Sequence, residues 1–301
     1  MNTNDIFNFR RFGKYFASDF RTCQANYGLS LIFITILVQV GLYVTTVALN
    51  GVFLQTWGGP GIGLRLSAFI VAIFCLTVTM PVKCYGRLTE KQYGSFWISL
   101  PASKLEKFIS MVIMTCFIVP AIGVTVYIAF DWLICLVDKT CEGSLISWAI
   151  SLSDDVNSML DKFAAALNNQ QDTMVGETAL TAEAMMRVFN QATSPWLYID
   201  EYLCMCLPFL LGAIFFKSAK TVKTFLAIAA VSSAISMITS PLFVGYYMDL
   251  LNEAITEDEA MARMFNSVFF QNIAWVDIIS DAIMNSAVLA CIWLRIKTLK
   301  H

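Results

Sequence analysis

The segment LSLIFITILVQVGLYVTTVAL, residues 29–49, contains no charged side chain. At about 1.5 Å per residue it has the length that a helix needs to cross a bilayer core of about 30 Å. Residues 66–82, 108–130 and 224–248 share this character. Of the 301 residues, 57% are hydrophobic and only 14% are charged, against about 45–50% and about 25% in soluble domains. Because a water-soluble fold of this length cannot bury so much apolar surface, these segments are predicted to span a membrane.

Two further segments are apolar but carry acids. Residues 197–216 include Asp200 and Glu201 near their start, and residues 275–294 include Asp277 and Asp281. With them, the sequence predicts an all-α polytopic membrane protein with six transmembrane helices over residues 29–301 and a cytoplasmic tail over residues 1–28.

The basic residues support six spans. Most of the 20 Lys and Arg residues lie before residue 29, in 83–107, in 217–223 and after residue 294, which are alternate connections. Lys and Arg accumulate on the cytoplasmic side of membrane proteins. This alternation predicts that both termini are cytoplasmic.

The connections on the other side are unequal. Residues 50–63 are short and Gly-rich, whereas the acidic outer loop 138–195 has helix-like apolar spacing at 146–167 and 179–189. A small helical cap is therefore predicted there. Residues 249–271 turn from acidic to apolar, which predicts a segment that returns to the outer bilayer surface.

The N-terminal tail has a stripe of aromatic side chains. If Asp5 caps a helix, Arg11, Lys14 and Ser18 lie opposite this stripe. The stripe consists of Ile6, Phe9, Phe12, Phe16 and Phe20. This pattern predicts an amphipathic helix in the cytoplasmic interface of the lipid bilayer. The plainer interpretation is a generic juxtamembrane anchor, without a gating role.

The connection after the second span reads KCYGRLTEKQYGSFWISLPASKLEK, residues 83–107. Thr89 with Gln92, and Ser103 with Glu106, have the spacing of a capping box, in which side chains satisfy free backbone N–H groups at a helix start. Pro101 disfavours helix at the residue before it. The sequence predicts two helices separated at Pro101, the second leading into the third span.

These residues carry a resemblance to a known family. Residues 90–95 (EKQYGS) and 100–107 (LPASKLEK) resemble the cytoplasmic loop of ABC-2 type transporter permeases, with Ser95 at the place of the usual Thr. The tail sequence FNFRRFG, residues 7–13, is similar to such permeases in Bacteroides-like bacteria. The clear motifs cover only about the first 110 residues.

The resemblance implies a location and partners. It implies a multi-pass protein of the bacterial inner membrane, the permease subunit of an exporter that forms a homo- or heterodimer and is driven by a separate ATP-binding cassette subunit. The tail would form an elbow helix, and the connection would dock onto the ATPase. The docking residues would be Thr89, Glu90, Lys91, Gln92, Gly94, Ser95, Pro101, Ser103, Lys104, Glu106 and Lys107.

No catalytic motif is evident in the sequence. The Gly-rich stretch 58–65 lacks the Gly-Lys-Ser/Thr ending of a P-loop, and the only histidine is His301. We expect no enzymatic activity, cofactor, metal or nucleic acid, and ATP hydrolysis on a partner chain. Cys135 and Cys141 would pair only in an oxidising outer compartment, and we treat them as free.

Other functions stay open. Asp277 and Asp281, four residues apart, form a candidate intramembrane polar site, since acids at membrane depth are costly. The favoured interpretation is that the last span begins after them. A non-transporting membrane module, such as an immunity or sensor protein with an acidic outer ligand-binding cap, is the main alternative to the exporter. An ion channel would rest on these two acids alone.

Overall fold

The computed structural model describes residues 7–54, 58–141, 143–151, 195–252 and 272–298. These ranges are almost entirely helical and contain no β-strand, which confirms the all-α prediction for the described residues. The α-helices are α1 (Phe9–Leu49), α2 (Ile62–Tyr85), α3 (Lys91–Ser99), α4 (Lys104–Ile113), α5 (Val119–Val137), α8 (Pro195–Phe215), α9 (Lys220–Asn252) and α12 (Ile273–Thr298). Two π-helices, η2 (Asn50–Leu54) and η4 (Met114–Ile118), and a 3-10 helix, η3 (Gly86–Thr89), lie between them.

Five helices are long and apolar enough to cross a membrane. They cover Phe9–Phe53, Ile62–Thr89, Lys104–Val137, Lys220–Tyr246 and Trp275–Thr298. Four of them contain a predicted span entirely, and Lys220–Tyr246 covers all but the last two residues of the predicted span 224–248. The sixth predicted span coincides with α8, which is not among the five. Its uncharged part, residues 202–215, extends only about 21 Å at the helical rise. The count of six spans therefore stays a prediction.

The tail and the first span form one helix, which differs from the predicted separate tail helix. Helix α1 has 41 residues without interruption, and its N-cap is Asn8 rather than Asp5. The Asn8 side chain accepts hydrogen bonds from the backbone N–H groups of Arg10 and Arg11. The sequence before Leu29 contains no proline, so nothing forces a break there.

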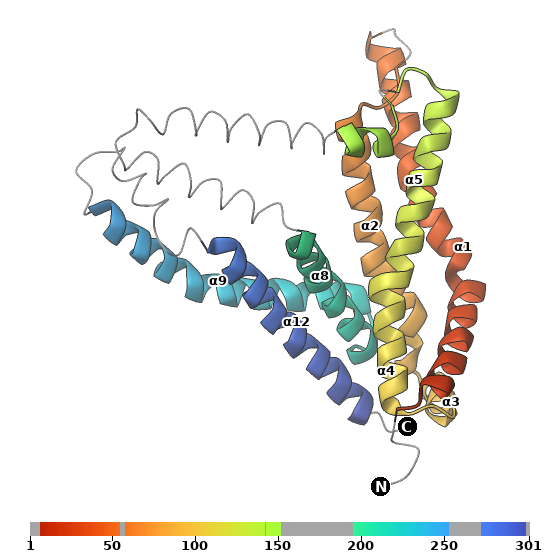
Figure 1. The fold of residues 1–301 in the computed structure, drawn as a ribbon, viewed down its shortest axis with the longest axis vertical. Helices are drawn as coiled ribbons and strands as arrows, with labels where there is room; N and C mark the ends of the chain where they lie inside the picture. The colour runs from red at the N-terminus through yellow and green to blue at the C-terminus, as the bar shows by residue number, and fades with distance from the viewer. Residues whose placement is uncertain (1–6, 55–57, 142, 152–194, 253–271, 299–301) are drawn as a thin grey trace, which may run out of the picture. The chain divides into compact units, whose positions relative to one another are not determined.

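The chain divides into two compact units. The first comprises Met1–Ser153, Met205–Thr224 and Val288–His301, and the second comprises Asp154–Cys204 and Phe225–Ala287. In the first unit, α1, α2 and α5 lie side by side (Figure 1). Their buried core contains small residues at Ala68 and Ala72 of α2, packed against Tyr127 and Leu145. Small side chains let neighbouring helices approach closely in a membrane protein.

Helices α4 and α5 are continuous through the π-helix η4. Pro120 stands in the first turn of α5, directly after η4. Proline lacks a backbone N–H and its ring crowds the preceding turn, so a local widening to π geometry accommodates it. The third predicted span thus exists as one rod from Lys104 to Val137.

The predicted cap is described only at its start. Residues 145–151 are helical, as expected from the pattern beginning at 146. The remainder of the predicted 146–167 helix, the 179–189 helix and residues 253–271 of the third outer segment lie outside the described residues.

Candidate functional site

The predicted docking region is a compact turn of chain between α2 and α4, here called connection 86–103. Helix α2 ends at Tyr85, η3 follows at once, and α3 then runs from Lys91 to Ser99. Leu100 leaves the helical conformation before Pro101, as the sequence predicts. Helix α4 then begins at Lys104, with Ser103 as its N-cap.

The second predicted capping box is present and does more than cap a helix. Ser103 Oγ accepts from the Glu106 N–H at 3.2 Å, and Glu106 Oε2 accepts from the Ser103 N–H at 2.9 Å. The Glu106 carboxylate also accepts from the Arg11 guanidinium, with Nε to Oε2 at 2.8 Å, and from the Asn8 N–H at 2.9 Å. The first turn of α1 is thereby bound to the first turn of α4.

Lys107 closes the other end of α3. Its Nζ donates to the carbonyl oxygens of Trp97 at 2.7 Å and Ile98 at 3.2 Å. It also lies 4.9 Å from the centre of the Trp97 ring, and Trp97 Nε1 donates to the Tyr15 hydroxyl at 3.1 Å. The last carbonyls of a helix need such donors, so Lys107 acts as the C-terminal cap of α3.

Asp19 of α1 makes a third contact, with the residues that flank the connection. Asp19 Oδ2 accepts from the Tyr85 hydroxyl at 2.8 Å and from Ser110 Oγ at 2.7 Å. These three residues belong to α1, α2 and α4. Together with Glu106 and Lys107, they hold connection 86–103 to the bundle at several points, which gives α3 a fixed position.

The first predicted capping box is wrong. The N-cap of α3 is Glu90, which makes no side-chain cap, and Thr89 Oγ1 donates instead to the Gly86 carbonyl at 3.1 Å. Thr89 Oγ1 also accepts from Lys220 Nζ at 2.8 Å, and Lys220 donates to the Gly86 carbonyl as well. Thr89 belongs to the preceding 3-10 turn, and Lys220 from the start of α9 satisfies that turn.

The predicted docking residues divide by exposure. Ser103, Glu106, Lys107 and Gly94 are buried, so they shape the connection from inside. Glu90, Ser95, Pro101 and Lys104 are exposed, and Thr89 is half-buried. The side chains of Lys91 and Gln92 lie outside the described part of the structure. Two apolar residues that sequence reasoning did not select, Phe96 and Ile98, are 63% and 40% exposed on α3.

The aromatic stripe of the tail is also partly exposed. Phe9 is 83% exposed, whereas Phe12, Phe16 and Phe20 are half-buried. Phe12 and Phe16 stack with their ring centres 5.7 Å apart. The stripe keeps the exposed apolar surface that an interfacial helix requires, although it is the first part of α1.

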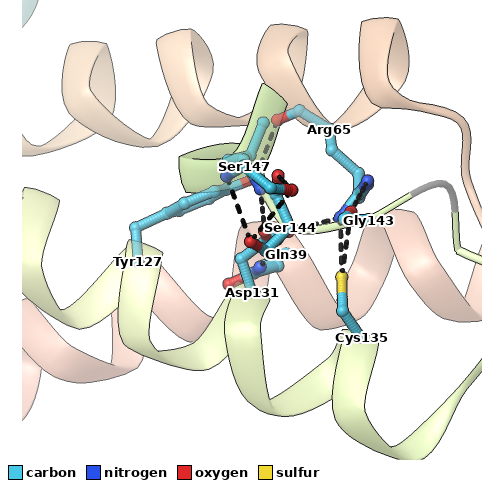
Figure 2. Close-up of polar contacts among 9 residues, drawn as sticks. Gln39, Arg65, Tyr127, Asp131, Cys135, Gly143, Ser144 and Ser147 are labelled. Atoms are coloured by element: carbon cyan, nitrogen blue, oxygen red, sulfur yellow. Dashed lines mark hydrogen bonds and ion pairs between the residues drawn. The ribbon is translucent and has the colours of Figure 1, made fainter. Parts of the chain in front are cut away.

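Sequence reasoning missed a buried ion pair at the other end of the same bundle. Arg65 Nη1 donates to Asp131 Oδ1 at 3.0 Å, and both side chains are almost fully buried, at 2% and 1% exposure (Figure 2). Asp131 Oδ2 accepts from the Leu145 N–H at 2.9 Å, and Arg65 Nη2 donates to the Gly143 carbonyl at 2.6 Å. The pair therefore holds residues 143–145 against α2 and α5.

Three further residues complete this network, which we call the Arg65–Asp131 cluster. The Tyr127 hydroxyl donates to the Arg65 carbonyl at 2.9 Å, Gln39 Nε2 of α1 lies 3.4 Å from Asp131 Oδ1, and Cys135 Sγ lies 2.9 Å from Arg65 Nη1 (Figure 2). A usable signal was present in the sequence. Arg65 and Asp131 are lone charges at the predicted outer ends of two adjacent spans, where charges are expected to pair.

The acids of the last span have separate surroundings. Asp277 is exposed, whereas Asp281 is half-buried and accepts a contact from Cys204 Sγ at 3.7 Å. No group of three or more Cys, His, Asp or Glu suited to a metal ion occurs among the described residues.

Comparison with models of known protein families, with characterised proteins and with solved structures finds no match for this chain.

Proposed function

We propose that the chain is the membrane-spanning permease subunit of an ABC-2 type exporter, and that connection 86–103 docks onto a separate ATP-binding subunit. The observation that carries the proposal is the fixed placement of α3. Lys107 of α4 and Tyr15 of α1 hold α3 directly. Asp19 and Glu106 fix the chain just before and just after the connection. Phe96 and Ile98 of α3 remain exposed.

This arrangement suits a surface that transmits force. A docking element must keep its shape when a partner pushes on it, because a loose loop would absorb the movement. The exposed apolar residues of α3 supply the kind of anchor that fills a pocket on a partner. Lys104 is the first residue of α4, and its Nζ donates to the Lys297 carbonyl at 2.9 Å. Its exposed side chain adds a positive charge to the proposed docking surface.

The proposal includes an orientation and an assembly. Connection 86–103 and both termini face the cytoplasm, in the bacterial inner membrane, where the ATPase has its nucleotide. Two permease subunits, identical or not, form the translocation path. Helix α9 contains a long apolar segment in which no residue is buried. Such a segment suits contact with lipid or with a second subunit.

The test is co-purification of an ATP-binding subunit with this chain from its native membrane. The docking variant is Phe96→Ser with Ile98→Ser, which removes apolar anchors without touching the buried supports. We expect it to recover at least about tenfold less ATPase than wild type, since anchor residues dominate interface energies. Phe9→Ser is the control, because it removes an aromatic residue of α1 that is even more exposed than Phe96, and it should retain the partner.

Lys107 is unsuited to this test because its reversal would unfold the end of α3. If the ATPase remained bound equally in the docking variant, connection 86–103 would not be the docking surface. If no ATPase were recovered even with wild type, the exporter proposal would fail.

One observation favours the alternative of a non-transporting immunity or sensor module. The Arg65–Asp131 cluster fixes the first residues of the acidic loop through Gly143 and Leu145, as a ligand-binding cap would require. Absence of an ATPase reading frame beside this one, together with binding of a ligand by the loop, would support this alternative.

A further inference from the structure

A second polar cluster joins α8 and α12 within the second unit. It consists of Asp200 and Cys204 on α8 and of Asp281 and Asn285 on α12. Asn285 Nδ2 donates to Asp200 Oδ1 at 2.8 Å, and Cys204 Sγ donates to Asp281 Oδ1 at 3.7 Å. The two residues on each helix are four apart, so they lie on the same face one turn from each other.

The charge of this cluster is unbalanced. The ion pairs among the described residues, Arg11 with Glu106 and Arg65 with Asp131, both lie elsewhere. The charged groups that act on Asp281 are Asp277, Asp200 and Glu201, all of them acidic. Asp281 lies within the candidate span Trp275–Thr298. Carboxylates without a basic partner inside a span are costly, and they are retained where an ion or a proton binds.

Two acceptor oxygens in the cluster have no donor. Asn285 is only 7% exposed, and while its Nδ2 is bonded to Asp200, its Oδ1 has no hydrogen-bond partner. The buried Oδ2 of Asp200 also has none. A buried acceptor without a partner is energetically costly, because it has lost its hydrogen bonds to water. The cluster therefore presents an excess of oxygen lone pairs.

We propose that Asp200, Asp281 and Asn285 bind a small monovalent cation. Hard cations take carboxylate and amide oxygens as ligands, and the two oxygens without donors are of this kind. A single positive charge placed among these oxygens satisfies them and offsets the repulsion of the acids. The Cys204 thiol donates to Asp281 and holds that carboxylate in place.

The sequence analysis treated Asp277 and Asp281 as one candidate site, but only Asp281 belongs to this cluster. Asp277, one turn earlier on α12, is exposed and contributes only its charge. Asp277 is thus a natural control for a general effect of negative charge. The proposal does not depend on docking of an ATPase, so the two succeed or fail separately.

The experiment measures binding of radioactive sodium ions to the full-length protein in detergent. Wild type and Asp277→Asn are expected to retain sodium, and unlabelled sodium or potassium chloride should displace it, whereas choline chloride at equal ionic strength should not, because choline is too large. Asp281→Asn and Asn285→Ala are expected to lose at least about tenfold in affinity. Asn285→Ala keeps both carboxylates, so it gives a reading even if Asp281→Asn does not fold.

Absence of sodium binding by wild type would overturn the proposal. It would also be overturned if both site variants bound sodium as wild type does, or if Asp277→Asn lost as much affinity as Asp281→Asn, because binding would then follow the general negative charge of the helix.

Discussion

Arg65 and Asp131 are each almost fully buried, and among the described residues each forms its ion pair with the other. Removal of one partner leaves an unpaired charge inside the bundle, which costs about 3–5 kcal/mol, whereas apolar replacement of both costs much less. We therefore expect Asp131→Leu and Arg65→Met to lower the unfolding free energy strongly when made singly, and the double variant to recover part of the loss.

Denaturant unfolding in detergent micelles measures these differences, and Arg21→Met at an exposed position is the control. If the double variant lost as much unfolding free energy as the two single variants together, the pair would not be coupled.

Cys141 gives a prediction of reactivity. Burial, and then the neighbouring Cys135 thiol, raise the pKa of the Cys141 thiol from its ordinary value of 9.0 to about 11. Only the thiolate reacts with iodoacetamide, so at pH 8 the reactive fraction falls about 100-fold. Alkylation of Cys141, followed by mass spectrometry, should be correspondingly slower than that of an unfolded peptide with the same sequence, and should accelerate as the pH rises toward 11. Equal rates in protein and peptide would contradict this environment.

At the scale of elements, two glycines set how closely helices pack. A Cβ at Gly212 of α8 would lie 1.8 Å from Thr224 Oγ1 of α9, and one at Gly123 of α5 would lie 2.3 Å from Leu76 Cδ1 of α2. Thr224 is branched at Cβ and Leu76 is fully buried, so neither side chain moves aside easily.

We expect Gly212→Ala and Gly123→Ala to cost about 1–3 kcal/mol each through overpacking. Gly41→Ala is the matched control, because nothing lies within 4 Å of its added Cβ. A lower midpoint temperature for the first two variants and an unchanged or higher one for Gly41→Ala would meet the expectation. Equal midpoints in all three would show that the helices separate without cost.

The sequence predicted those elements that depend on local pattern. Uncharged length placed the spans, and the Ser103 and Glu106 spacing placed the start of α4, because both signals lie within a few turns of chain. The tail was harder, since no local signal distinguishes an interfacial helix from the continuous α1. Thr89 was misassigned because Lys220, more than 100 residues away, supplies the interaction that draws it into the 3-10 turn.

The candidate site divides in the same way. The predicted docking residues were found by motif, but which of them face outward was not predictable. The burial of Glu106 and Lys107, for example, depends on contacts with α1 and with the end of α3. The Arg65–Asp131 cluster joins α1, α2, α5 and the following loop, and only the fold brings these together.

At the scale of the whole molecule, the orientation is open to direct measurement. The distribution of basic residues predicts that a reporter fused after His301 is active only as a cytoplasmic marker. A reporter inserted near Asp172, in the long acidic loop, should be active only as an external marker. The reverse pattern at both positions would contradict the orientation. Location of both reporters on the same side would contradict the three spans predicted between them.

The unbroken length of α1 has a mechanical consequence. Arg11 near its start is bound to Glu106, and Tyr43 near its far end donates to Asp138, so one rod touches both ends of the bundle. Its 41 residues extend for about 60 Å. A lever of that length without a hinge turns a tilt of about 10° at one end into a displacement of about 10 Å at the other. A movement of the helix near the Glu106 contact is therefore transmitted to the opposite end of the bundle, because no break in α1 lies between them.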